Sequence, residues 1–71
     1  MALAAHDAAD RVDQLIILTE RLTALLAEEC QAFERRRPQD AAPHVEETQR
    51  LANLYRHESA RVRADPRLVA S

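Results

Sequence analysis

The sequence predicts an all-α protein, folded as an antiparallel hairpin of two long amphipathic helices. Its 71 residues include no glycine and are rich in alanine, leucine, glutamate and arginine, a composition that favours helices. Apolar residues recur at helical spacing on both sides of a single break at residues 37–40. A connection this short leaves only an antiparallel neighbour for the second helix.

The first helix is predicted from about residue 8 to residue 36. Asp7 is suited to be its N-cap, and Asp10 resembles the second member of a capping box. Pro38 ends this helix because a proline disfavours helical geometry at the residue before it. Arg11 and most other charged residues lie away from the centre of an apolar stripe. The stripe consists of Val12, Leu15, Leu18, Leu22, Leu25, Leu26, Cys30 and Phe33.

The second helix is predicted from about residue 41 to residue 64, and a short C-terminal tail, 65–71, completes one helical unit that spans residues 1–71. Asp40 is expected to cap this helix, and Pro43 fits its first turn, where a missing N–H costs nothing. The helix is expected to end near Ala64, because Asp65 precedes Pro66. Its inward face mixes apolar and polar residues, namely His44, Thr48, Leu51, Leu54, Tyr55, Glu58 and Val62.

The apolar stripe of the first helix is wider than the second helix can cover. Each large aliphatic side chain left in water forfeits about 1.5–3 kcal/mol. We therefore expect the hairpin to complete a four-helix bundle, either by self-association as a homo-oligomer or by binding an amphipathic helix of a partner protein. The expected contact residues are Leu15, Leu18, Leu22, Leu25, Leu26, Phe33, Leu51, Leu54 and Tyr55.

Four side chains need separate interpretation. Ile17 lies opposite the stripe, either as an isolated exposed aliphatic residue or as a second contact surface. Glu29 and Glu58 either reach the rim or pair with an arginine, unless they fix the register of a partner. Cys30 is expected to pack as a small hydrophobic residue rather than to act as a reactive thiol.

Composition argues against several functional classes. A net charge of −2 argues against a nucleic-acid binder, and the longest strongly apolar run, 15–18, predicts no membrane insertion. A lone cysteine without a secretion signal predicts a cytoplasmic location. Without glycine there is no phosphate-binding loop, and the three histidines are too scattered for a metal site. We therefore expect no cofactor and no metal.

The alternative function is that of a helical enzyme. Helical mutases of the chorismate type use inward-facing arginines, and Arg11, Arg50 and Arg61 are the candidates for such a role here. Most inward positions are aliphatic instead, so no catalytic residue and no enzymatic activity are expected.

Several features between Leu15 and Val69 match a known pattern. They are the leucine- and glutamate-rich stretch 18–29, the basic-to-proline break 35–38, the stretch 46–55 (EETQRLANLY) and the triplet Ala64-Asp65-Pro66. In these features the sequence resembles the FlgN-type flagellar export chaperones, particularly short alphaproteobacterial members.

The resemblance implies a cytoplasmic chaperone that holds hook–filament junction proteins for the flagellar type III export apparatus and binds them as amphipathic helices. It implies no catalytic residues. Members of that family are usually longer, with a further helix after a segment like Asp65-Pro66, so the chain is expected to be either a short relative or one that lacks a third helix. A homodimeric structural or regulatory scaffold, unrelated to secretion, is the competing interpretation.

Overall fold

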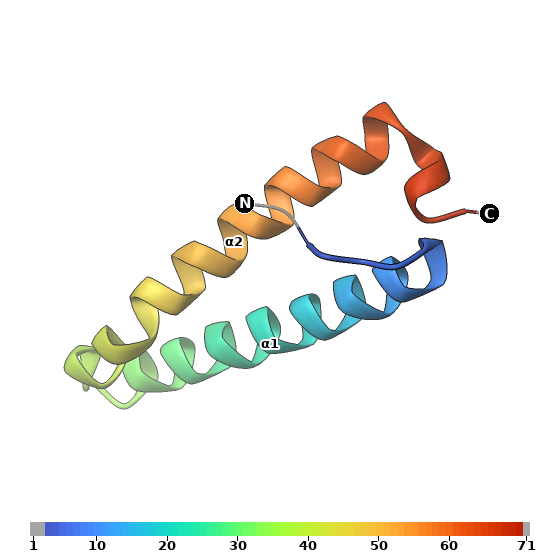
Figure 1. Cartoon of the computed structure of the whole chain (residues 1–71). Helices are drawn as coiled ribbons and strands as arrows, with labels where there is room; N and C mark the ends of the chain where they lie inside the picture. Colours follow the sequence, from blue (N-terminus) through green and yellow to red (C-terminus); the bar gives the residue numbers. More distant parts are fainter. Residues whose placement is uncertain (1–2, 71) are drawn as a thin grey trace.

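The computed structural model describes residues 3–70. Two long helices, α1 (Ala8–Glu34) and α2 (Ala42–Ala64), run antiparallel and are joined at a corner that contains the 3₁₀ turn η1 (Pro38–Asp40) (Figure 1). A second 3₁₀ turn, η2 (Pro66–Leu68), follows α2 and packs back against both helices. Residues 3–70 contain no strand, so the predicted all-α hairpin is confirmed. Completion of a four-helix bundle stays a prediction.

Local hydrogen bonds set both ends of α1. Its N-cap is Asp7, as predicted, because the Asp7 carboxylate accepts the N–H of Asp10 over 2.8 Å. The helix ends at Glu34 rather than near Arg36, because Arg36 adopts a left-handed conformation with φ 58°. The N–H of Arg37 then donates to the carbonyl of Ala32 over 2.8 Å. This is a Schellman termination with arginine at the position where glycine is usual.

The start of α2 differs from the prediction. Asp40 does not cap it, because Asp40 lies inside η1 and donates its own N–H to the carbonyl of Arg37. The N-cap is Ala41, without a side-chain hydrogen bond, and Pro43 falls in the first turn as expected. The helix ends at Ala64, where the chain leaves helical geometry before Pro66. The predicted tail therefore begins with a turn, and Ser71 lies outside the described residues.

The core of the hairpin is narrow. Three buried residues of α1 follow one another at seven-residue spacing, namely Leu18, Leu25 and Ala32, and Leu25 is completely inaccessible to solvent. Ala41 closes the core at the corner. A single line of small and medium side chains therefore holds the two helices together, in a molecule 47 Å long and 17 Å wide.

Candidate protein-binding face

A buried ion-pair cluster lies between the two helices, near the end opposite the corner. The carboxylate of Glu58 is 0% exposed. Its Oε1 accepts hydrogen bonds from the N–H of Leu3, over 2.9 Å, and from Arg61 Nη1, over 3.0 Å. Its Oε2 accepts from Arg11 Nη1 over 3.1 Å, and Arg11 is itself buried. Glu58 was expected either to reach the rim or to pair with an arginine. Its carboxylate pairs with two arginines and lies in the interior.

The surroundings of Glu58 hold it in the charged form. Burial by itself raises the pKa of this carboxyl, because a buried charge loses hydration. The hydrogen bond from the N–H of Leu3 and the ion pairs with Arg61 and Arg11 act in the opposite direction and outweigh burial, so the pKa of Glu58 lies below its usual value. The cluster is therefore a charged structural centre in which both oxygens of the buried carboxylate accept hydrogen bonds from the hairpin and its N-terminal segment.

The nine predicted contact residues occupy three different environments. Leu18 and Leu25 are buried in the hairpin core. Leu15, Leu22, Leu51 and Leu54 are half-buried. The other three are exposed, with 47% of Leu26, 62% of Phe33 and 42% of Tyr55 accessible to solvent. The structure thus separates the predicted face into a part that closes the hairpin and a part that reaches the surface.

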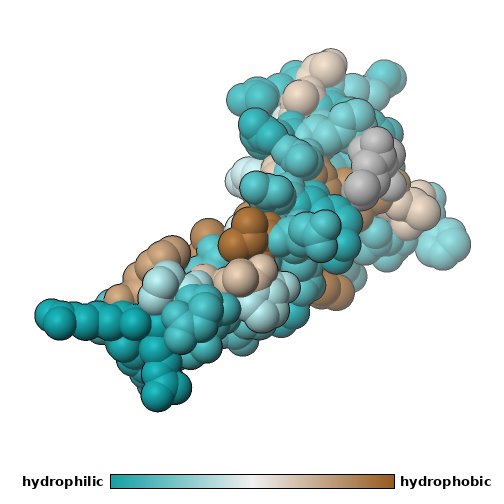
Figure 2. Space-filling view, turned by 90° about the vertical axis from the view of Figure 1, so that its left-hand side faces the viewer, coloured by the Kyte–Doolittle hydropathy of each residue, from teal (hydrophilic) through white to brown (hydrophobic). Residues whose placement is uncertain are grey.

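The surface part forms a stripe on one flank of the buried line. Leu15, Leu22, Leu26 and Phe33 follow one another at spacings of seven, four and seven residues, so they share one side of α1. We call these four residues the open stripe. At its N-terminal end, Leu15 lines a groove of about 330 Å³ together with residues of α2, namely Tyr55, Ser59 and Val62. Seen from the corner, hydrophobic atoms come to the surface between hydrophilic ones (Figure 2).

One polar residue interrupts the stripe. Glu29 follows Leu22 by seven residues and is half-buried. Its Oε1 accepts a hydrogen bond from Thr48 Oγ1 over 2.6 Å, which joins the two helices on this flank. The bond gives Glu29 a role within the hairpin, which does not require a partner protein. Its carboxylate nevertheless borders the apolar surface.

Polar contacts also cross the opposite flank of the hairpin. Arg21 donates two hydrogen bonds to the carboxylate of Glu47, each over 3.0 Å, and the bonding lowers the pKa of Glu47. Nearer the open end, Gln14 Nε2 donates to the carbonyl of Ala4 over 2.7 Å. These contacts tie α1 to α2 and to the N-terminal segment on this flank.

The chain has a flagellar relative. It is 66% identical, over all 71 of its residues, to the flagellar basal-body protein FlbY of Caulobacter vibrioides. The chain spans about half of that protein, 48% of its length. No family model matches the sequence, and no solved structure matches it.

Two expectations about single residues are wrong. Arg11, placed away from the stripe, is buried beside Glu58, and Cys30, expected to pack as a hydrophobic residue, is exposed. Both errors have one cause. The residues that α2 covers, Leu18 and Leu25, lie at one edge of the apolar stripe rather than at its centre. Arg11 precedes Leu18 by seven residues, and this heptad spacing is the signal that could have identified it.

Sequence reasoning missed one further residue of the cluster. Leu3 reaches Glu58 although 55 positions separate the two in the sequence. No periodicity marks an extended segment that folds back, so the sequence carried no signal for it. Within residues 3–70, no helix is long and apolar enough to cross a bilayer.

Proposed function

We propose that the chain is a non-enzymatic, helical protein-binding module that acts in the cytoplasm as a flagellar export chaperone of the FlgN type. Its cargo would be a hook–filament junction protein, held through an amphipathic helix until export by the type III apparatus. The open stripe is the proposed contact surface.

The observation that carries this proposal is the position of α2 on α1. Because α2 covers the edge of the apolar stripe, it leaves Leu26 and Phe33 exposed in the middle of a helix face. An amphipathic helix laid along the open stripe would bury these side chains, with apolar anchors at helical spacing. The flagellar relative supports the biological setting, and the resemblance to export chaperones supports the role.

A structural scaffold is the second candidate. The relative is named a basal-body protein, which favours a component of an assembly over a carrier. In this case a second copy of the hairpin would cover the open stripe and complete a four-helix bundle. The same surface serves both candidates, so the occupant of the stripe decides between them.

The test uses two substitutions that introduce the same charge on opposite sides of α1. Leu26→Asp places a carboxylate in the open stripe, whereas Ala24→Asp places one on an exposed position outside it. Neither side chain belongs to the buried core, so both variants are expected to keep the helicity of the unchanged protein by circular dichroism.

Each protein is titrated with the C-terminal helical segment of a hook–filament junction protein and followed by calorimetry, while light scattering gives its mass. The chaperone proposal predicts a complex with the segment that Leu26→Asp abolishes and Ala24→Asp retains. A stable dimer that ignores the segment and dissociates on Leu26→Asp would favour the scaffold. A monomer that binds nothing, or equal binding by both variants, would contradict the use of this surface.

A further inference from the structure

The segment before α1, residues 3–7, folds back over the hairpin. In Figure 1 it runs between α1 and α2 at their open end, where the two helices diverge. Two hydrogen bonds join its backbone to the body of the hairpin, from the N–H of Leu3 to Glu58 and from Gln14 to the carbonyl of Ala4. The N–H of His6 also donates to the carboxylate of Asp10, in the first turn of α1. We call residues 3–7 the N-terminal strap.

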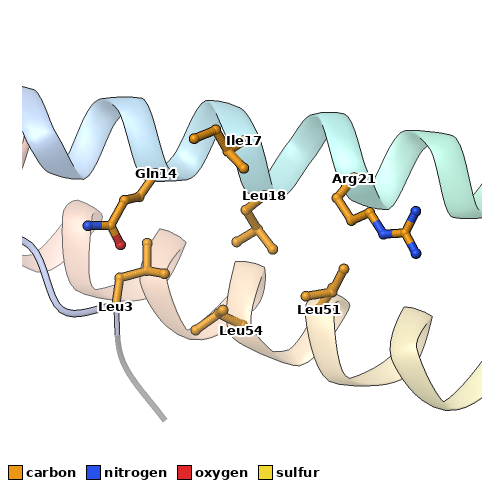
Figure 3. A pocket seen from close by; sticks show the side chains of 7 residues that line it. All are labelled: Leu3, Gln14, Ile17, Leu18, Arg21, Leu51 and Leu54. Carbon is orange, nitrogen blue, oxygen red and sulfur yellow. The ribbon is translucent and has the colours of Figure 1, made fainter.

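The side chain of Leu3 enters an apolar groove between the helices. Ile17 and Leu18 of α1 and Leu51 and Leu54 of α2 line this groove, and the space left beside Leu3 has a volume of about 290 Å³ (Figure 3). Arg21 lies at one end of the groove and Gln14 at the other (Figure 3). The groove lies on the flank opposite the open stripe, and it remains partly empty beside Leu3.

The N-terminal strap makes few apolar contacts with the hairpin. Ala4 and His6 are exposed, so Leu3 supplies the main apolar contact. Glu58, by contrast, is also held by Arg11 and Arg61, which do not belong to the strap. The site therefore consists of an apolar groove next to a carboxylate oxygen that accepts a backbone N–H.

We propose that this groove is a second peptide-binding site, which the N-terminal strap occupies in place of a partner. Its ligand is an extended segment with a leucine or a similar aliphatic residue, whose backbone N–H binds Glu58 as that of Leu3 does. The strap blocks the site in the isolated chain, and a partner segment enters when the strap is displaced. The site is separate from the open stripe, so a test of this proposal does not depend on the proposed chaperone function.

The probe is the strap itself, as the acetylated hexapeptide LAAHDA, which begins with the leucine that corresponds to Leu3. It is titrated by NMR into the full chain and into the variant Leu3→Ser, which removes the apolar side chain of the strap from the groove and is expected to weaken the binding of the strap. A tethered segment competes at an effective concentration on the order of millimolar. We therefore expect the variant to bind the peptide at least about tenfold more tightly than the unchanged chain does.

In the variant, saturable chemical-shift changes at the methyl groups of Leu18, Leu51 and Leu54 would support the proposal. The control peptide has serine in place of leucine and should cause no such changes. Equal binding by variant and unchanged chain would show that the strap does not block the site. No saturable binding to the variant, at unchanged helicity, would show that the groove does not take such a segment. Either result overturns the proposal.

A second measurement applies if Leu3→Ser does not fold. Gln14→Ala removes one strap hydrogen bond from a half-buried position on α1 and leaves Leu3 and the core intact. The amide of Leu3 should then exchange with solvent at least about tenfold faster than in the unchanged chain, because its bond to Glu58 opens more often. An unchanged exchange rate would contradict a displaceable strap.

Discussion

Replacement of Glu58 by alanine should nearly unfold the protein. The substitution leaves the buried guanidinium of Arg11 and the N–H of Leu3 without their acceptor. Removing one partner of a buried ion pair costs about 3–5 kcal/mol. A chain of this length is stable by roughly 4–11 kcal/mol, at about 0.05–0.15 kcal/mol per residue. The loss is therefore comparable to the lower end of the total.

The assay is urea denaturation followed by circular dichroism, which gives the free energy of unfolding. The matched control is the double variant Arg11→Met/Glu58→Leu, which removes both charges and fills the space with apolar atoms. Such exchanges of buried ion pairs are commonly neutral or stabilising by about 1–4 kcal/mol. The reasoning would be refuted by a loss below about 1 kcal/mol for Glu58→Ala, or by a double variant no more stable than the single one.

Three further outcomes are expected from the same denaturation assay. Leu25→Ala should lower the free energy of unfolding by about 2–5 kcal/mol, because it leaves a cavity at a completely buried site. Ile17→Ala is the control: at a position 64% exposed, it should change the free energy of unfolding by less than about 0.5 kcal/mol. Arg36→Gly should raise it by about 1 kcal/mol, since glycine adopts the left-handed conformation of this residue without steric cost, and a loss would contradict the termination described for α1. Folding lowers the pKa of Glu58, so the stability that its ionised form contributes should be fully present above about pH 4.3 and be lost as the pH falls through the lowered pKa. The double variant Arg11→Met/Glu58→Leu should lack this loss of stability in acid. If the loss persisted in the double variant, it would have to come from other groups.

The fold could be predicted because its signals are local. Proline at positions 38 and 66 limits how far each helix can extend, and Asp7 marks where the first begins. Apolar spacing defines the faces, and the short connection fixes the antiparallel arrangement. Each of these features depends on neighbouring residues alone, so sequence reasoning reaches it without knowledge of the packing.

The packing itself could not be predicted from the same pattern. A wide apolar stripe does not specify which of its edges a second helix covers, and this choice placed Arg11 inside and Cys30 outside. The N-cap of α2 was mispredicted for a related reason. Asp40 lies inside the turn η1, where its N–H donates to Arg37, and Ala41 is therefore the N-cap of α2. The return of Leu3 to Glu58 is a long-range contact with no local signature.

The most direct test of the account measures whether the open stripe is accessible in the isolated chain. A soluble paramagnetic agent broadens the NMR signals of side chains that it can approach. We predict strong broadening at Leu22, Leu26 and Phe33 in the dilute chain, and its loss when a second copy or a junction-protein segment binds. A lone monomer in which these three side chains are protected from the agent would contradict the account, because α2 would then already cover the whole apolar face.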